Sequence, residues 1–405
     1  MKVGITISAK PGESIWKNGI LQNAIFFYDL LEKLPSISDV SFLQCSSSDV
    51  FDKDPFPISG YTYEFFNSDT IDSIRKDYRI LFSLGALPPT DHINIYKENK
   101  DNRFVQYKGG NEFINEIESV LYGQYLGWNN IELSSKRYFP SETDEVWMVP
   151  QQEFHNSSYM SIKHRTETRV VPFIWNSKFL DESANELMSK KDNEYSIYFK
   201  DKKFDEGWNW VSFEPNMSLL KNMMPILYTC EHLWRTIDNK DLIDKFMITN
   251  ADGHLKNDSL VQIVAGMDIQ KDRKVSFEGR YPSPFILYRY AHGVISHQWG
   301  NALNYAYLDT CYFGIPLVHN AHLCKDLGFY YEGWDLKGAA LQMKKAMNTM
   351  RSNDSYLTKQ KKRLKRYTIE NQSMINQYDL LVKNLFNKNS IDGMRNYNPV
   401  TNLVQ

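Results

Sequence analysis

Polar side chains cluster in one stretch of the sequence, directly after a short apolar run from Gly293 to Ser296. The cluster consists of His297, Gln298, Asn301, Asn304 and Asp309. A turn at Gly314 and a second apolar run follow, so the pattern predicts strand, polar loop, helix, tight turn and strand. Ligands of open α/β sheets bind just beyond the carboxyl ends of strands. A lone histidine is more often structural, but this whole group indicates a ligand site.

The spacing within this cluster suggests what it binds. Asn301 and Asp309 are eight residues apart, which on a helix places them about 80° apart on one broad side. Asn304 flanks Asn301 on the other side. A carboxylate at the far end of such a helix can accept hydrogen bonds from ribose or sugar hydroxyls.

A second candidate site follows another apolar run, Trp210–Phe213. Glu214 and Asn216 form the loop after this predicted strand, and a helix is expected to begin near Met217 with Lys221 in its first turns. The N–H groups of a helix N-terminus bind phosphate, and a lysine offsets its charge. The alternative is a capped helix with a surface lysine, but the position after a strand favours a pyrophosphate.

The N-terminal part of the chain shows a similar pattern. The predicted strand Lys2–Ile7 is followed by a helix, Ile20–Leu34, that opens with Asn18 and Gly19. There is no GxGxxG motif, so no dinucleotide fingerprint is present. Asn18 fits an N-cap and a ligand contact equally well.

A glycine pair follows the predicted strand Phe104–Tyr107. The sequence Lys108-Gly-Gly-Asn111 would let the backbone approach a ligand, with Lys108 meeting an anion, or would simply form a turn. Strands and helical patterns alternate through most of residues 1–155 and again after residue 170. This alternation predicts an α/β fold with parallel sheets covered by helices.

The boundary between two domains is expected in the polar, irregular stretch His155–Arg169. A chain of 405 residues favours two domains. We expect an N-terminal domain at 1–160, a C-terminal domain at 170–350, one polar helix within 351–388 that packs toward the N-terminal domain, and a tail at 389–405.

Composition and missing motifs exclude several classes of protein. The formal net charge of −2 argues against nucleic-acid binding by bulk charge. Four cysteines without CxxC spacing indicate reduced thiols of a cytoplasmic protein. GxSxG, HExxH, P-loop and EF-hand motifs are absent, and the one DxD, Asp52–Asp54, fits a solvated turn, so no metal is expected. No apolar run approaches the length of a membrane span, and no signal peptide is recognised.

Basic residues cluster near the C-terminus, within a helical pattern at Ser355–Phe386. Such a run is usually a solvated helix face, and the alternative is contact with DNA phosphates. The candidates for that contact are Lys361, Lys362, Arg363 and Arg366.

The second half of the chain resembles the C-terminal half of a GT-B glycosyltransferase, an enzyme of two Rossmann-like domains facing each other across a cleft. The resemblance rests on Asn301 to Asp309 and the turn Gly314-Ile-Pro316. The common retaining enzymes have two glutamates at the spacing that Asn301 and Asp309 keep here.

The whole chain more specifically resembles the family DUF2827 of bacteria and their phages. The matching pieces are Ser14–Ala24, Val105–Asn111, Val146–Gln151, Phe213–Asn216 with Lys221, and Ser296–Trp299 with Ala302–Tyr305. They span both expected domains. The family pattern has a glutamate where Gly300 stands, so any role of that carboxylate is lost or moved here.

The resemblance implies sugar transfer from a nucleotide-sugar, with a UDP-sugar favoured and no cofactor or metal required. Donor contacts would come from Glu214, Asn216, Lys221, Gln298, Asn301 and Asn304. Catalytic roles would fall to His155, His297 and Asp309, with Glu153 as another candidate base. The wall on the acceptor side would be formed by Asn18, Gly19, Gln22, Lys108, Asn111 and Gln151. Among these residues, Asp309→Ala is expected to reduce turnover sharply.

The acceptor stays open between a glycan and a hydroxymethylated base in phage DNA. A DNA base would have to be extruded from the duplex to reach the site. The other open functions are a nucleotide-sugar epimerase of the same fold and a non-catalytic protein that only holds a nucleotide-sugar. The donor sugar, the stereochemistry of transfer and the oligomeric state are not indicated by the sequence.

Overall fold

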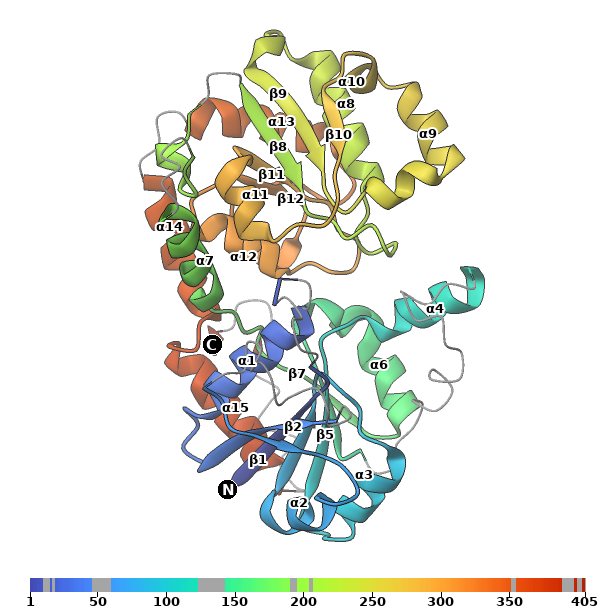
Figure 1. The fold of residues 1–405 in the computed structure, drawn as a ribbon, viewed down its shortest axis with the longest axis vertical. Helices are drawn as coiled ribbons and strands as arrows, with labels where there is room; N and C mark the ends of the chain where they lie inside the picture. Colours follow the sequence, from blue (N-terminus) through green and yellow to red (C-terminus); the bar gives the residue numbers. More distant parts are fainter. Residues whose placement is uncertain are drawn as a thin grey trace. The chain divides into compact units, whose positions relative to one another are not determined.

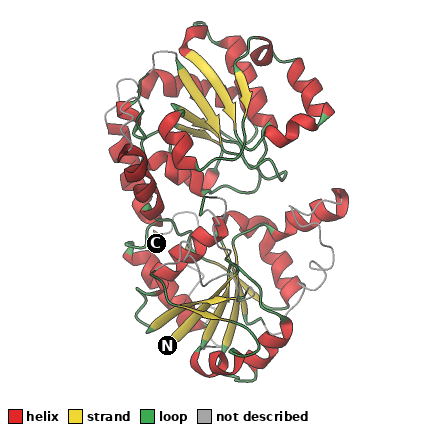
Figure 2. Ribbon diagram, in the orientation of Figure 1, coloured by secondary structure: helices red, strands yellow, loops and turns green. Residues whose placement is uncertain are grey.

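In a computed structural model, the chain folds into two compact units. Unit 1 comprises Met1–Asn176 and Arg366–Gln405, and unit 2 comprises Ser177–Lys365. The described residues are 1–9, 15–16, 19–45, 60–122, 143–189, 195–203, 207–350, 355–387, 397–398 and 403–404. Each unit is a parallel sheet with helices on both faces (Figure 1, Figure 2).

The sheet of unit 1 has the strand order β3-β2-β1-β4-β5-β6-β7, and every pairing is parallel. Its strands are β1 (Lys2–Ile7), β2 (Asp39–Gln44), β3 (Tyr63–Phe65), β4 (Ile80–Ser83), β5 (Arg103–Lys108), β6 (Glu145–Met148) and β7 (Glu167–Val170). The order reverses between β1 and β4, as in doubly wound Rossmann-like sheets. Apolar side chains such as Val3, Ile5 and Phe42 are fully buried because helices cover both faces.

The helices of unit 1 come from both ends of the chain. They are α1 (Gly19–Leu31), α2 (Ile71–Asp77), α3 (Thr90–Lys97), α4 (Glu112–Tyr122), α6 (Glu153–His164) and α15 (Gln372–Asn384). Tyr378 of α15 lies in the core, where its hydroxyl is 3.1 Å from that of Tyr107 and donates to the Pro172 carbonyl at 2.7 Å. The sequence-distant helix α15 is therefore an integral part of unit 1.

The sheet of unit 2 has the order β10-β9-β8-β11-β12-β13, again with every pairing parallel. Its strands are β8 (Trp208–Ser212), β9 (Ile243–Ile248), β10 (Val275–Phe277), β11 (Gly293–Ile295), β12 (Leu317–His319) and β13 (Phe329–Tyr330). Gly293 pairs beside Trp210, and a Cβ there would lie 2.6 Å from the indole, so only glycine fits. The order reverses between β8 and β11, which creates a second switch point.

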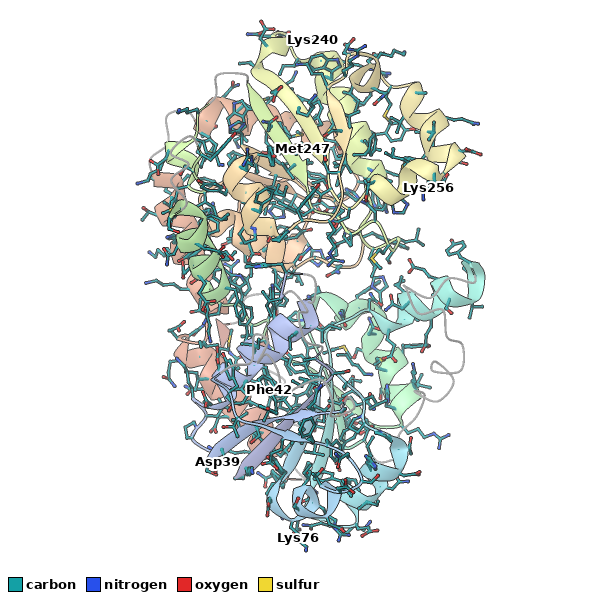
Figure 3. The ribbon with its side chains drawn as sticks, viewed as in Figure 1. Asp39, Phe42, Lys76, Lys240, Met247 and Lys256 are labelled. Carbon is teal, nitrogen blue, oxygen red and sulfur yellow. The ribbon has the colours of Figure 1, made fainter. Side chains whose placement is uncertain are left out.

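Eight helices of the described part of unit 2 cover this sheet. They are α7 (Lys178–Ser189), α8 (Met224–Thr236), α9 (Asp258–Ala265), α10 (Asp268–Lys271), α11 (Ser283–Arg289), α12 (Tyr305–Tyr312), α13 (Leu336–Met350) and α14 (Ser355–Leu364). Side chains fill the space between sheet and helices in both units, whereas Lys76 and Lys240 lie at the surface (Figure 3). None of the described helices is long and apolar enough to cross a bilayer. Two short strands, β14 (Tyr397–Asn398) and β15 (Leu403–Val404), pair antiparallel.

Three predicted elements are wrong. The stretch His155–Arg169 is not irregular, because it contains most of α6 and the edge strand β7. Tyr195–Phe199, an apolar and aromatic run whose sequence predicts a strand, forms none. The single C-terminal helix is two helices, since a 3-10 turn at Lys365–Tyr367 ends α14 and Asn371 caps α15 by accepting from the Ser373 N–H at 3.0 Å.

Candidate functional site

The switch point of unit 2 brings together the first residues after β8 and β11. Glu214 follows β8, Ser296 follows β11, and the two strands are neighbours. Ser296 Oγ donates a hydrogen bond to Glu214 Oε1. The same hydroxyl is hydrogen-bonded to Tyr307 Oη of α12, 2.8 Å away. Two strand ends and one helix thus meet at a single buried carboxylate.

The Glu214 carboxylate is held in a low-polarity environment. Burial raises its pKa, while the charge of Lys221 and the hydrogen bond from Ser296 act in the opposite direction. Burial lowers the pKa of Lys221, and the charge of Glu214 opposes this shift. Burial removes water from both the carboxylate and the ammonium. An additional polar partner would therefore stabilise their charged forms.

The loop that carries Glu214 is locked to the end of β9 by two asparagines. Asn216 and Asn250 have φ values of +55° and +56°, a left-handed conformation that asparagine tolerates. Asn216 Nδ2 donates to the Thr249 carbonyl at 3.1 Å, and Asn250 Nδ2 donates to the Glu214 carbonyl at 3.1 Å. The paired asparagines therefore fix the backbone next to the carboxylate.

His297 presents an acceptor nitrogen at the same edge. The Tyr331 hydroxyl lies 3.1 Å from the Ser296 carbonyl and 2.9 Å from His297 Nδ1, and we assign its hydrogen to the carbonyl, so that its oxygen accepts from His297 Nδ1. This assignment leaves His297 Nε2 unprotonated, and burial lowers the pKa of the ring to about 4. The half-exposed Trp334 ring lies 4.4 Å from the imidazole, centroid to centroid. At pH 7 this histidine is a neutral acceptor.

Three polar atoms at this edge are buried without a hydrogen-bond partner among the described residues. They are Glu214 Oε2, Asn216 Oδ1 and His297 Nε2. An unsatisfied buried polar atom costs about 1–3 kcal/mol, and native proteins keep few of them. All three are acceptors, so the hydroxyl groups of a ligand would supply the missing donors.

Gln298 holds the loop that follows β11. Its N–H donates to Asn320 Oδ1 at 2.9 Å, and its Oε1 accepts from the Asn301 N–H at 2.7 Å. Asn320 Nδ2 also donates to the Gln298 and Gly333 carbonyls, at 2.8 and 2.9 Å. Gly300 turns the loop at a φ of +67°, which suits glycine and would strain a glutamate.

The helical spacing predicted for Asn301 and Asp309 is wrong. Helix α12 begins only at Tyr305, so Asn301 lies in the loop before it. Asn304 is the N-cap, and its Oδ1 accepts from the Ala306 N–H at 3.3 Å. Asp309 is buried within α12. The α12 residue that contacts the Glu214–Ser296 pair is Tyr307, which sequence reasoning missed because a tyrosine on an apolar helix is usually a core residue.

The predicted position of Lys221 in a helix is also wrong. Helix α8 begins at Met224 with Pro225 in its first turn, and Lys221 lies in the loop that precedes it. Proline favours the first turn of a helix because it lacks an N–H. Lys221 stays close enough to shift the pKa of Glu214, but it reaches the carboxylate from a loop.

In unit 1, several of the predicted residues make hydrogen bonds or ion pairs within the protein, while Asn111 Nδ2 and Gln151 Oε1 are buried without a hydrogen-bond partner among the described residues. Lys108 Nζ lies 3.2 Å from Glu112, and Asn111 caps α4 by accepting from the Ile114 N–H at 3.1 Å. Gln22 Nε2 donates to the Ile15 carbonyl at 3.0 Å. Gly19 is the exposed first residue of α1, and Asn18 is outside the described residues.

The remaining unit 1 candidates lie just after β6. Gln151 belongs to the 3-10 turn Pro150–Gln152 and is partly buried. His155 stacks on Phe113 with ring centroids 6.5 Å apart, and burial lowers its pKa. Both residues therefore lie at the carboxyl edge of the unit 1 sheet, where a second ligand would meet them.

The basic C-terminal segment has partners in the protein. Lys361 lies 4.3 Å from the centroid of the Tyr312 ring, and Arg363 Nε lies 3.6 Å from Asp326. Arg366 donates to the Tyr367 hydroxyl at 3.0 Å and belongs to unit 1, whereas Lys362 is exposed. Within the described residues, no group of three or more His, Cys, Asp or Glu could hold a metal ion.

Comparisons with known proteins agree on the fold. A family model described as "Protein of unknown function (DUF2827)" matches residues 3–382. The search of curated proteins found no match. A sucrose-phosphate synthase from Thermosynechococcus elongatus is 11% identical with a TM-score of 0.51, over 95% of this chain and 99% of that one.

Two further solved structures are similar. The α,α-trehalose 6-phosphate synthase of Burkholderia multivorans is 9% identical with a TM-score of 0.57, over 95% of this chain and 96% of that one. The pneumococcal O-GlcNAc transferase in complex with UDP and GlcNAc is 7% identical with a TM-score of 0.51, over 95% of this chain and 98% of that one. With the two sheet topologies, these similarities identify two Rossmann-like domains of the GT-B fold.

Proposed function

This chain belongs to the DUF2827 family, and we propose that it is a glycosyltransferase that moves a sugar from a nucleoside diphosphate-sugar to an acceptor hydroxyl. The observation that carries the proposal is the set of unpaired acceptors around Glu214 at the unit 2 switch point. A sugar nucleotide brings several hydroxyl donors and a diphosphate to one place. The similar pneumococcal transferase holds UDP and GlcNAc, which supports a UDP-sugar as the first donor to test.

The residues of unit 2 suit the two halves of such a donor. Lys221 is the cation near the switch point and would neutralise the diphosphate. Glu214 and His297 would accept hydrogen bonds from ribose or sugar hydroxyls, and Asn216 would bind beside them. Gln298 would act by holding the loop, and Asn301 and Asn304 would contact the donor only where the loop and the cap of α12 leave them accessible.

Sugar transfer breaks the bond between the anomeric carbon and the diphosphate oxygen and forms a bond to the acceptor oxygen. The diphosphate leaves with the electron pair, and the acceptor hydroxyl loses its proton. Lys221 stabilises the negative charge that develops on the leaving oxygen. Electrostatic stabilisation of this kind is usually the largest single contribution to the rate enhancement. His155, His297 and Asp309 are the candidates for handling the proton.

For the acceptor, we propose a glycan or another small hydroxyl compound. Of the four basic residues considered for DNA contact, Lys361, Arg363 and Arg366 interact with side chains of the protein itself. Gln22, Lys108, Asn111 and Gln151 are the acceptor-side candidates of unit 1. Transfer to hydroxymethylated DNA is the alternative outcome of the same experiment.

The test is a thermal-shift panel of UDP-, GDP- and dTDP-sugars, followed by mass spectrometry of products with glycan and hydroxymethylcytosine DNA acceptors. We expect one nucleotide-sugar to stabilise the protein and to be consumed only with an acceptor present. Conversion of the donor without any acceptor would identify an epimerase. Binding without conversion would identify a non-catalytic protein, and binding of no nucleotide-sugar would refute the proposal.

A further inference from the structure

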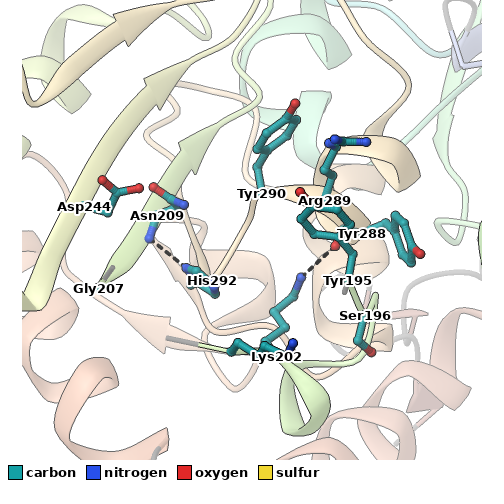
Figure 4. A pocket seen from close by; sticks show the side chains of 11 residues that line it. Tyr195, Ser196, Lys202, Gly207, Asn209, Asp244, Tyr288, Arg289, Tyr290 and His292 are labelled. Carbon is teal, nitrogen blue, oxygen red and sulfur yellow. Dashed lines mark hydrogen bonds between the residues drawn. The ribbon is translucent and has the colours of Figure 1, made fainter. Parts of the chain in front are cut away.

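A cavity of unit 2 lies at the opposite edge of the sheet from Glu214 and Ser296. Its volume is about 400 Å³. It lies where β8 and β9 begin and directly before β11, so it is at the amino ends of these strands. The residues that matter for its chemistry are Tyr195, Lys202, Asn209, Arg289 and His292 (Figure 4), together with Lys203. This cavity is therefore separate from the candidate donor site.

Cations dominate the charged side chains of this cavity. Among the described residues that line it, the charged side chains are the cations Lys202, Lys203 and Arg289 and the carboxylate of Asp244. Lys202 Nζ donates to the Leu287 and Tyr288 carbonyls, at 2.7 and 3.1 Å. These bonds cap the C-terminus of α11 and use two of the three ammonium N–H groups. The ammonium is thus fixed in place with one donor left for a ligand.

The cation of Lys202 is costly to maintain without an anion. Burial lowers its pKa to about 7. Arg289 lies with its guanidinium 4.7 Å from the centroid of the Tyr195 ring, which orients the second cation by cation–π contact. Lys203 also lines the cavity, but its side chain is exposed to solvent. A phosphate group bound here would meet positive charge that is already positioned.

The facing wall is rigid and offers an acceptor. His292 Nδ1 accepts from the Asn209 N–H at 2.9 Å, which joins the loop before β11 to β8. Gly207 has a φ of +100°, and a Cβ there would lie 2.8 Å from the Asp241 carbonyl oxygen, so the backbone leaves no room for another residue. Asn209 Oδ1 is buried without a partner among the described residues. A ligand hydroxyl would supply the missing donor.

We propose that this cavity binds a small sugar phosphate, with the phosphate against Lys202 and Arg289 and a sugar hydroxyl against Asn209. The volume is within the range of small-molecule sites, about 300–1,000 Å³. The tyrosines Tyr195, Tyr288 and Tyr290 provide ring faces and hydroxyls, which suit the alternating apolar and polar surface of a sugar. The proposal does not depend on glycosyl transfer by the other edge of the sheet.

The test is calorimetric titration of the full chain with glucose 6-phosphate, glucose and inorganic phosphate, in the presence and absence of a saturating nucleotide-sugar. We expect the ester to bind more tightly than phosphate and glucose not to bind. Arg289→Gln is expected to weaken the ester about tenfold, the loss of one charge-assisted hydrogen bond. Lys245→Gln is the matched control, because Lys245 is the neighbour of Asp244 on β9 but does not line the cavity.

Three results would overturn the proposal. They are no binding of the ester at millimolar concentration, unchanged affinity in Arg289→Gln, or displacement of the ester by the nucleotide-sugar, which would locate the ester at the donor site. Equal affinity for phosphate and ester would overturn the sugar contact. Should Arg289→Gln unfold, Asn209→Leu provides the second variant, since loss of the Oδ1 acceptor removes the proposed contact with the sugar hydroxyl and should weaken binding of the ester but not of inorganic phosphate.

Discussion

In unit 1, the charged side chains near the carboxyl edge of the sheet form close ion pairs, whereas in unit 2 the charges of Glu214 and Lys221 act on each other without a close ion pair among the described residues. Lys163 bridges Glu112 and Glu116, and Lys108 adds a second cation on Glu112. At the corresponding edge of unit 2, Glu214 is buried with one oxygen unpaired among the described residues, and its cation Lys221 acts on it from a loop.

The difference separates two uses of the same fold. Salt bridges that are complete within the protein contribute to stability or specificity but leave nothing for a ligand to satisfy. Unpaired acceptors lower the stability of the free protein. A ligand that donates hydrogen bonds to them removes this cost and stabilises the protein. We therefore expect changes in the unit 1 cluster to alter unfolding, and changes at the unit 2 switch point to alter donor binding.

Acidification should destabilise unit 2 more than unit 1. Burial lowers the pKa of His297 and His319 to about 4, and burial together with Lys202 does the same for His292. Each folded pKa lies below the unfolded value of about 6.5. Their contribution is therefore complete above pH 6.5 and is lost as the pH falls toward 4, at roughly 3 kcal/mol at most for each histidine.

Unit 1 contains one described histidine of this kind, His164, whose pKa is about 4 because of burial and the charge of Lys108. Burial alone would raise the pKa of Glu112, but Lys108 and Lys163 hold it at about 2, so its contribution is lost only below about pH 4.5. Hydrogen exchange of the backbone amides of each sheet at pH 7 and pH 5, corrected for the intrinsic exchange rate, measures how much stability each unit loses on acidification. A larger loss of protection in the unit 1 sheet would contradict the prediction.

Removal of the cation at the centre of the unit 1 cluster should destabilise the protein strongly. Lys163→Met leaves Glu112 and Glu116 in a site where the lysine side chain is only 5% exposed. Breaking such a buried pair costs about 3–5 kcal/mol. Urea unfolding measures the loss, and nucleotide-sugar affinity should stay unchanged in the folded variant.

The control for this change is Lys33→Met, which removes an exposed pair with Glu370 at 4.0 Å. Exposed pairs contribute about 0–1 kcal/mol. If the two variants lose equal stability, the cluster around Lys163 is not what stabilises unit 1.

Lys221→Met should weaken the nucleotide-sugar without a comparable loss of stability. A hydrogen bond to a charged group contributes about 1.5–3 kcal/mol, so the Kd is expected to rise about 10- to 100-fold. The unit 1 counterpart is Lys108→Met, whose cation already pairs with Glu112, and its donor affinity should change less than about threefold. Calorimetric titration compares the two, and a larger effect from Lys108 would reverse the assignment of the donor to unit 2.

The smallest effect is expected from a pair of tyrosine hydroxyls, one in each unit. Tyr307→Phe removes the hydrogen bond to Ser296 and should cost about 1 kcal/mol of unfolding free energy together with a loss of donor affinity. Tyr107→Phe removes the hydroxyl next to Tyr378 and should cost a similar amount of stability alone. Matched urea titrations and donor titrations decide whether only the unit 2 hydroxyl is linked to binding.

Buried strands and strongly periodic helices are predictable from the sequence. The apolar runs of β1 and β11 are as expected, and the periodic pattern of Leu336–Met350 predicts the bounds of α13. The edge strands β3 and β7 could not be predicted from the sequence. Their residues, Tyr63–Phe65 and Glu167–Val170, are at most partly buried and show no apolar run. An edge strand faces solvent on one side, so its sequence carries little of the signal that marks a central strand.

The candidate site is predictable at the level of segments but not of contacts. Glu214 and His297 follow apolar strands, which is visible in the sequence. The role of Tyr307 depends on the position of α12 against β11, and the start of α12 is set by the cap at Asn304. The apolar neighbours of Lys221 predict a helix around it, although the helix begins at Met224.

Unit 1 is formed from two segments of the chain that are separated by the whole of unit 2, and this affects folding during synthesis. All seven strands of its sheet precede residue 176, but α15 leaves the ribosome about 200 residues later, after the whole of unit 2. At about 5–20 residues per second, this delay is on the order of 10–40 s. During that time the core around Tyr107 lacks Tyr378 and its contact with Pro172. The nascent N-terminal unit therefore stays incompletely packed until unit 2 and then α15 have been synthesised.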